Sequence, residues 1–180
     1  MLSLYIFLFF IYDIFNMDSK ITTCLPSQIG DLTFEIARGK LLSLSIAEKA
    51  SPNDTIEPFN IDSDNQLRES MLQQLKKYFY SATLFRTIPT APQGTLFQKS
   101  VWNELTKIPI GETRTYGEIA NKLNSSARAV GNACRKNPIQ IIIPCHRVIS
   151  ANGLGGYAGE TSGRQLDIKR WLLNHEGVGL

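Results

Sequence analysis

Hydrophobic residues occupy alternate positions in the first half of the chain. Leucine, phenylalanine and isoleucine stand at positions 32, 34 and 36, and after an Arg-Gly pair at 38–39 leucine and isoleucine return at 42, 44 and 46. Most of the residues between them are threonine or serine. A two-residue period interrupted by a glycine turn predicts a β-hairpin with one buried face and one face in water.

The hairpin is followed by a segment with helical periodicity. Leucine, methionine and phenylalanine recur every four residues from position 67 to position 79, which predicts an amphipathic helix over residues 66–80. The stretch before it is polar and irregular, so we expect a turn at residues 51–54 and a connecting loop over residues 57–64. Together these elements predict a small α+β lobe.

Shorter helices are predicted in the second half, after a linker marked by Pro89, Pro92 and Gly94. Threonine is followed three residues later by glutamine or glutamate at 95–98 and at 115–118, which is the spacing of a capping box that begins a helix. We expect the first of these helices to turn four apolar residues inward, namely Phe97, Val101, Trp102 and Leu105.

A third helix is predicted over residues 127–135, with Ser126 as its N-cap. Because only the polar turn 124–126 separates it from the helix before it, the pair is a candidate helix-turn-helix. We expect the inward face to consist of Ala127, Val130 and Cys134, and the outward face of Arg128, Asn132, Arg135 and Lys136. Many surface helices divide in this way, but small residues beside basic ones also let a helix approach a nucleic-acid groove closely.

A cysteine is the strongest candidate for chemistry. Residues 141–143 are isoleucines followed by a proline, which predicts a short buried strand that ends at Pro144. Cys145 comes next, beside a histidine and an arginine that can stabilise a thiolate. The cysteine of an isolated Cys-His pair is more often a small buried hydrophobic residue than a nucleophile. However, Asn137 precedes a proline and is suited to brace the loop that carries the thiol.

These segments together resemble the O6-alkylguanine-DNA alkyltransferases, also called methylated-DNA-protein-cysteine methyltransferases. The resemblance extends from about residue 94 to residue 177 and is carried by Asn137-Pro138, the apolar run, Pro144-Cys145-His146-Arg147-Val148 and Leu172-Leu173-Asn174-His175-Glu176-Gly177. It implies an α+β fold. A ribonuclease-H-like lobe over residues 17–90 would precede a mainly helical DNA-binding and alkyl-transfer domain over residues 94–180, which contains the helix-turn-helix and the active-site cysteine loop.

The resemblance implies DNA repair by direct transfer of the alkyl group from O6-alkylguanine in double-stranded DNA to Cys145. The transfer is expected to be stoichiometric and irreversible, to follow base flipping by a minor-groove helix-turn-helix, and to need no cofactor or metal. Activity on O4-alkylthymine is left open. One alternative is a non-catalytic alkyltransferase-like protein that binds the lesion, which would lack Cys145. Another is a cysteine hydrolase, in which the basic helix would have no purpose.

The resemblance also implies roles for individual residues. His146 is expected to act as the base through a bridging water, oriented by Glu176. Tyr116 would donate a proton or a hydrogen bond to the leaving guanine. Arg128 would take the place of the flipped base in the DNA. The other expected DNA-binding residues are Ala127, Ala129, Gly131, Asn132 and Arg135. The expected substrate pocket consists of Pro144, Arg147, Val148, Tyr157 and Ala158.

Charge and cysteine content are consistent with this hypothesis. Residues 1–94 carry eight Lys and Arg against ten Asp and Glu, whereas residues 95–180 carry eleven against six, so the positive charge lies in the half with the cysteine loop. Three cysteines without a Cys-x-x-Cys pair, and only two histidines, argue against a disulfide framework and against a zinc site. A catalytic thiol needs a reducing compartment, so we expect a cytoplasmic protein. We also expect a monomer that does not bind membranes.

The extension formed by residues 1–16 is almost wholly apolar up to Phe15, but it is shorter than the roughly 20 residues that span a bilayer. A mis-assigned start with translation from Met17, a peripheral anchor and a poor signal peptide are the three interpretations. The first is favoured because the predicted strands begin only after Lys20.

Overall fold

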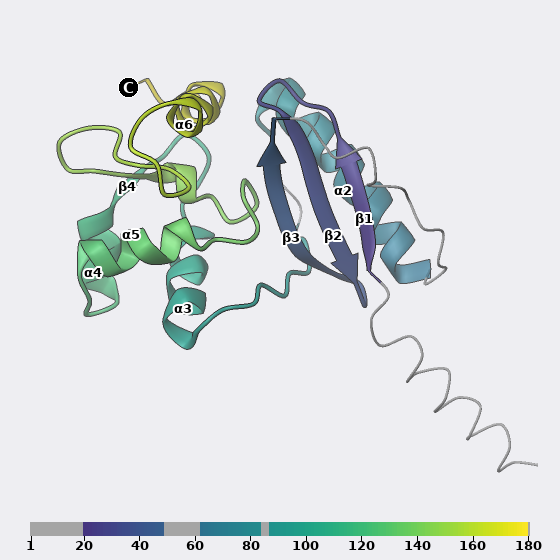
Figure 1. Ribbon diagram of the computed structural model, residues 1–180, viewed down its shortest axis with the longest axis horizontal. Helices are drawn as coiled ribbons and strands as arrows, with labels where there is room; N and C mark the ends of the chain where they lie inside the picture. The colour runs from purple at the N-terminus through teal and green to yellow at the C-terminus, as the bar shows by residue number, and fades with distance from the viewer. Residues whose placement is uncertain (1–19, 49–61, 84–86, 180) are drawn as a thin grey trace, which may run out of the picture.

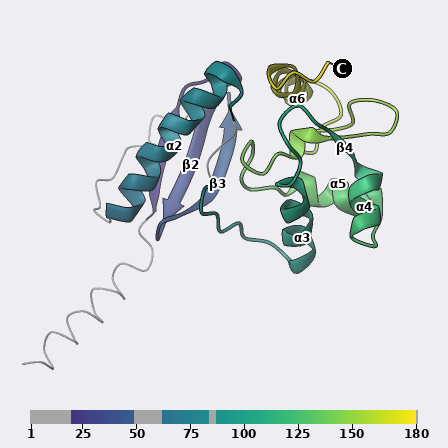
Figure 2. The same ribbon diagram turned by 180° about the vertical axis from the view of Figure 1, so that it is seen from behind.

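A computed structural model describes residues 20–48, 62–83 and 87–179. The predictions for the extension 1–16 and for the turn 51–54 lie outside these residues. Two parts stand side by side, a sheet covered on one face by a long helix and a cluster of shorter helices (Figure 1, seen from behind in Figure 2). The described chain therefore has the α+β fold that the sequence predicts.

The predicted hairpin is confirmed and has a third strand beside it. The antiparallel sheet contains, in this order, β1 (Ile21–Leu25), β2 (Asp31–Ala37) and β3 (Lys40–Ala47). The apolar side chains of β2 at 32, 34 and 36 are fully buried. The pattern of β3 differs from the prediction at one position. The register shifts opposite Ile36, so Leu42 is the extra residue of a bulge and Leu41 is buried in its place.

Helix α2 (Asp62–Ser81) covers one face of this sheet (Figure 1). Its fully buried side chains include Met71, Leu75 and Tyr78. The helix begins earlier than predicted, because residues 62–64 form its first turn instead of the end of a loop. The Asp64 carboxylate accepts hydrogen bonds from the backbone N–H groups of Arg38 and Gly39 in the hairpin turn. These bonds hold the helix start against the sheet.

The second part contains α3 (Leu96–Leu105), α4 (Tyr116–Lys122), α5 (Ala127–Arg135) and α6 (Arg164–His175). The three predicted N-caps are confirmed, since Thr95, Thr115 and Ser126 each accept a hydrogen bond from the backbone N–H three residues later. Phe97 and Ala127 are exposed and not inward-facing as predicted. Both lie in the first turn of their helices, which projects beyond the core.

The apolar run before the cysteine is a turn and not the predicted strand. Ile139 makes a single parallel bridge to Leu44 of β3. Ile141 then has a φ of 69°, which takes the chain out of extended geometry. Ile141 and Ile143 are nevertheless buried, as their apolar character indicates. The run therefore contributes to the core without adding a strand to the sheet.

The cysteine itself begins a short 3₁₀ turn, η1 (Cys145–Arg147). This turn leads directly into β5 (Val148–Ile149), which pairs in parallel with β4 (Arg114–Thr115). Because β4 immediately precedes α4, this short pairing places the start of α4 beside the cysteine turn.

Main-chain hydrogen bonds join the two parts along the edge of β3. The N–H of Leu41 donates to the Pro89 carbonyl at 2.8 Å, and its carbonyl accepts from the Ala91 N–H at 2.9 Å. Leu44 pairs in the same way with residues 138–140, at 2.9 Å for each bond. The loop that leads to the cysteine is thus attached to the sheet by its backbone.

Gly94 packs against the indole of Trp102, so we expect Gly94→Ala to destabilise the fold. A Cβ at this position would lie 2.5 Å from Cη2 of the indole, which is almost fully buried. The indole is also held by a 2.9 Å hydrogen bond from its Nε1 to the Ala133 carbonyl, so it cannot move without disturbing α5. We expect the free energy of unfolding to fall by about 1–3 kcal/mol, measured by urea denaturation.

Gly179→Ala is the matched control, because a Cβ there would meet no atom within 4 Å. Equal stability of the two variants would contradict the predicted clash.

Candidate active site

Cys145 is buried and held by one side chain. It stands at the start of η1 and is 4% exposed. The Asn137 amide donates to the Cys145 sulfur at 3.2 Å and to the Ile143 carbonyl at 2.7 Å, while its oxygen accepts from the Ile139 N–H at 3.0 Å. Asn137 therefore braces the loop that carries the thiol, as the sequence predicts. It also gives a hydrogen bond to the sulfur.

The ionisation of the thiol depends on different groups from those that the sequence suggests. Burial raises the pKa of Cys145, whereas the hydrogen bond from Asn137 and the positive charge of Lys169 lower it. The backbone N–H groups of Cys145 and His146 also lower it, but in the described part of the chain no side-chain hydrogen bond joins the sulfur to His146 or Arg147. Although these two residues follow the cysteine directly, their side chains turn toward Glu176. Adjacency in sequence does not produce contact here.

The Glu176 carboxylate is the centre of a buried network. Its Oε1 accepts hydrogen bonds from Tyr78 Oη at 2.7 Å and Arg147 Nη2 at 2.8 Å, and it lies 3.0 Å from His146 Nε2. Its Oε2 accepts from Arg147 Nε at 2.7 Å. Burial alone would raise the pKa of Glu176, but the hydrogen bonds from His146 and Arg147 hold it well below its usual range. The carboxylate is therefore ionised at neutral pH.

The hydrogen bond to Glu176 determines the form of His146. An ionised carboxylate only accepts hydrogen bonds, so His146 Nε2 must carry a proton. Burial lowers the pKa of His146, and the bond to Glu176 opposes this effect. A neutral ring protonated at Nε2 has its lone pair on Nδ1, which is buried and has no hydrogen-bond partner among the described residues. His146 Nδ1 is thus available to accept a hydrogen bond.

Lys169 is a functional candidate that the sequence reasoning missed. It is fully buried on α6, and its ammonium donates to the carbonyls of Val148 at 2.6 Å, Leu154 at 2.6 Å and Gly156 at 3.0 Å. Burial lowers the pKa of Lys169 to about 8. These bonds hold the chain that follows the cysteine turn. A lysine three residues after Leu166, within an apolar helical stripe, was the available signal.

Tyr116 is the first residue of α4 and lies between the cysteine turn and the 155–156 glycine pair. Its hydroxyl donates to the Gly156 carbonyl at 3.1 Å. Burial raises the pKa of Tyr116, as do the neighbouring Cys134 and Cys145. Gly155, with a φ of 69°, packs so closely that a Cβ would lie 3.1 Å from the tyrosine ring. The phenol is therefore a hydrogen-bond donor at neutral pH.

A cavity of about 320 Å³ connects the thiol to the surface of α5. It contains eight of the predicted residues, namely Cys145, Tyr116, Ala127, Gly131, Asn132, Arg135, Tyr157 and Ala158. Cys134, which the sequence assigns to the core, also lines it, together with residues 156 and 159–161. The cavity thus brings the nucleophile, a phenol donor and the exposed face of a basic helix into one space.

Some predicted residues do not line this cavity. Arg128 and Ala129 lie on α5 outside it, Arg128 exposed and Ala129 half-buried. Val148 is fully buried in β5. Pro144 and Arg147 line a second and larger cavity of about 670 Å³, behind the cysteine turn. Arg147 faces it with its guanidinium fixed by Glu176 and by a 2.6 Å bond to the Ile108 carbonyl.

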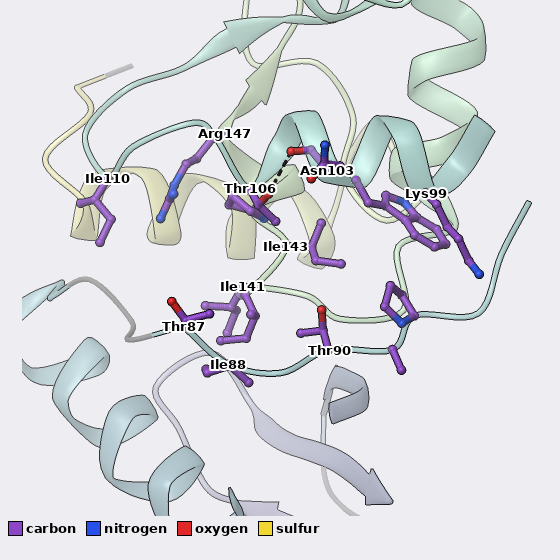
Figure 3. Close-up of a pocket in the computed structure, with 15 residues that line it drawn as sticks. Thr87, Ile88, Thr90, Lys99, Asn103, Thr106, Ile110, Ile141, Ile143 and Arg147 are labelled. Atoms are coloured by element: carbon purple, nitrogen blue, oxygen red, sulfur yellow. Dashed lines mark hydrogen bonds between the residues drawn. The ribbon is translucent and has the colours of Figure 1, made fainter. Parts of the chain in front are cut away.

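Figure 3 shows this second cavity, with Thr87, Ile88 and Thr90 facing Asn103 of α3 and Thr106, the C-cap of that helix. Neither the thiol nor His146 lines it. Although it is the larger of the two, it is therefore not the place where chemistry at the cysteine occurs.

Within residues 20–48, 62–83 and 87–179, no group of three or more His, Cys, Asp and Glu side chains is arranged to hold a metal ion. Over these residues there is also no helix that is both long and apolar enough to cross a membrane.

Residues 96–178 match the family model described as "6-O-methylguanine DNA methyltransferase, DNA binding domain". The chain is 52% identical over 120 residues to a methylated-DNA-protein-cysteine methyltransferase of Methanosarcina acetivorans, covering 65% of this chain and 73% of that protein. It is 49% identical over 140 residues to the protein of the same name from Methanosarcina mazei, covering 76% and 82%.

Solved structures agree with these sequence matches. The O6-methylguanine methyltransferase of Mycobacterium tuberculosis superposes with a TM-score of 0.72 at 36% identity, over 88% of this chain and 93% of that one. A structure of the Mycobacterium tuberculosis protein OGT in complex with DNA gives a TM-score of 0.68 at 39% identity, over 85% and 90%.

The depressed pKa of Glu176 predicts a specific dependence of stability on pH. Ionised Glu176 stabilises the fold above its unfolded pKa of about 4.3, and this stabilisation is lost as the pH falls through the lower folded pKa. At pH 7 we expect Glu176→Gln to lower the free energy of unfolding by about 3–5 kcal/mol, because it leaves the buried Arg147 charge unpaired. The difference from the wild type should shrink below about pH 4.

Urea denaturation at pH 7, 5, 4 and 3 measures this difference. Glu160→Gln, at an exposed position, is the control and should show no such convergence. A stability difference for Glu176→Gln that stays constant with pH would rule out the proposed ionisation.

Proposed function

Because the chain belongs to the methylated-DNA-protein-cysteine methyltransferase family, we propose that Cys145 accepts the alkyl group of O6-alkylguanine in DNA. The observation that carries this assignment is the cavity in which a hydrogen-bonded thiol lies below the exposed face of a basic helix. The reaction is DNA repair by direct transfer, and the protein is consumed in it. Among the candidate substrates, O6-alkylguanine is favoured over O4-alkylthymine by the family-model description.

The transfer is a displacement at carbon. The Cys145 sulfur attacks the alkyl carbon, an S–C bond forms, and the bond between that carbon and O6 breaks with its electron pair left on guanine. The thiol proton passes to His146 Nδ1 through a bridging water. Tyr116 gives a proton or a hydrogen bond to the leaving guanine, which lowers the cost of expelling an anion. A thioether is not hydrolysed, so each molecule reacts once.

Glu176 and Asn137 support this step without touching the substrate. When His146 takes up the proton, the Glu176 carboxylate at 3.0 Å stabilises the imidazolium. Asn137 stabilises the developing thiolate through its 3.2 Å hydrogen bond. The remaining pocket residues, Tyr157 and Ala158, lie at the cavity wall, where they would contact the guanine.

The substrate base must leave the DNA stack to reach a thiol that is 4% exposed. We propose that α4 and α5 act as a helix-turn-helix in the minor groove of double-stranded DNA. Ala127, Ala129 and Gly131 would allow close approach, and Arg128 would fill the space of the flipped base. The exposed positions of Arg128, Asn132 and Arg135 on α5 support this role.

The domain assignment follows the same division. Residues 94–180 would carry DNA binding and transfer, and residues 17–90 would form a ribonuclease-H-like lobe that supports them. The three antiparallel strands with a single covering helix are consistent with part of such a lobe. We propose that the protein acts as a monomer.

Incubation with DNA that carries a labelled methyl group on O6 of guanine tests the central step. We expect one label per protein molecule, attached to Cys145, and no transfer by Cys145→Ala. The variant should retain DNA binding within about threefold, because the thiol contributes little to contact with the phosphate backbone. Cys24→Ala, in β1, is the control. Label on another residue, or more than one turnover per molecule, would overturn the assignment.

Arg128→Ala tests base flipping separately from chemistry. We expect the rate with duplex DNA to fall by about tenfold or more, since flipping costs a few kcal/mol and 1.4 kcal/mol is a factor of ten. The rate with the free base O6-methylguanine should stay unchanged. Arg170→Ala, which removes an exposed charge from α6, serves as the comparison. Equal losses on both substrates would show that Arg128 has no role in flipping.

A further inference from the structure

We propose that Tyr78, a residue of α2, positions the His146–Glu176 pair and thereby sets the pH range in which Cys145 is activated. The proposal rests on the proposed function of Cys145. Tyr78 lies outside residues 96–178, the part matched by the family model. It would give the first part of the chain a direct influence on the reaction, beyond mechanical support.

Tyr78 is fully buried and fixed at both ends. Its hydroxyl donates to Glu176 Oε1 at 2.7 Å, and its backbone carbonyl accepts from His175 Nε2 at 2.6 Å. Its ring meets the His175 ring edge to face, with centroids 5.4 Å apart. Residues far apart in sequence are therefore locked together where the end of α2 meets the end of α6 (Figure 2). The phenol cannot move independently of the Glu176 carboxylate.

The aromatic residues beside this contact make it rigid. The His175 ring stacks on Trp171 at 4.7 Å with an interplanar angle of 17°. Phe79 stacks on His175 at 6.4 Å and lies tilted against Trp171 at 5.6 Å. These contacts use ring surfaces and do not need the Tyr78 hydroxyl. Removing that hydroxyl should therefore leave the packing intact and change only the hydrogen bond to Glu176.

The hydrogen bond has an electrostatic effect because it ends on the oxygen that His146 also uses. Glu176 Oε1 accepts hydrogen bonds from the side chains of Tyr78, His146 and Arg147 at the same time. Each donor withdraws some of the negative charge that the carboxylate presents to the others. With Tyr78 in place, Glu176 attracts a proton on His146 less strongly than it otherwise would.

The other charged groups near His146 are already engaged. Arg147 is bound to Glu176 and Ile108, and Lys169 is bound to three carbonyls. Both are positive and lower the pKa of His146, while Glu176 raises it. The phenol itself stays protonated, because burial and the nearby Glu176 raise the pKa of Tyr78. Tyr78 is thus a permanent hydrogen-bond donor, and it limits the effect of the negative Glu176 carboxylate on the pKa of His146.

Tyr78→Phe tests this role in the full chain. Neutral His146 is the base, so the transfer rate falls as the pH drops below its pKa. Loss of the Tyr78 hydrogen bond strengthens the attraction of Glu176 for the imidazolium and raises the pKa of His146. We expect the acid limb of the rate of methyl transfer from O6-methylguanine DNA to move upward by about half a pH unit to one unit. The rate on the high-pH plateau should stay within about threefold.

Tyr80→Phe is the matched control, because Tyr80 lies two residues further along α2 and is 91% exposed. A second measurement follows the His146 ring protons by NMR without substrate. The chain has only two histidines, so the two titrations can be told apart. We expect the pKa of His146 to rise in Tyr78→Phe and to be unchanged in Tyr80→Phe.

An unchanged His146 titration and acid limb in a folded Tyr78→Phe protein would overturn the proposal, as would a shift to lower pH. A uniform loss of rate at every pH would indicate a structural role only and would overturn it as well. Failure of the proposed function looks different, because the wild-type protein would then transfer no methyl group to Cys145 at any pH.

Discussion

The active site depends on one buried carboxylate. Glu176 takes hydrogen bonds from three side chains that belong to α2 and to the cysteine turn, and it is itself the C-cap of α6. A buried charge is costly unless it is paired and hydrogen-bonded, and Arg147 supplies both the charge and two of the bonds. Because Arg147 is used in this way, the thiol does not have its help, and Asn137 and Lys169 stabilise the sulfur instead.

Sequence reasoning succeeded where a structure is decided by a few neighbouring residues. The caps at Thr95, Thr115 and Ser126 each involve residues three positions apart, so their pattern is visible in the chain. The isoleucine run failed as a strand because an apolar segment becomes a strand only if a partner pairs with its full length. Ile139, just before the run, makes a single bridge to Leu44, and the turn at Ile141 follows at once.

The same limit applies to the site. Asn137 was predicted because it acts on a loop within eight residues of itself. Tyr78 was not, because its partner lies 98 residues away in sequence and the contact exists only when α2 and α6 meet. In the motif from Pro144 to Val148, Cys145 lines one cavity, whereas Pro144 and Arg147 line another. A motif therefore identifies residues reliably and their directions much less so.

Along β3, the seam between the two parts is made of peptide groups from Leu41, Leu44 and the loops beside them. Peptide groups are the same in every residue, so such a seam tolerates almost any exchange of side chains that preserves the path of the backbone. Along β3, sequence drift can therefore proceed without coordinated replacements, unlike at the side-chain contact between Tyr78 and Glu176. A backbone seam of this kind is compatible with a shared architecture that extends over 88% of the chain, although the family model matches only the helical part.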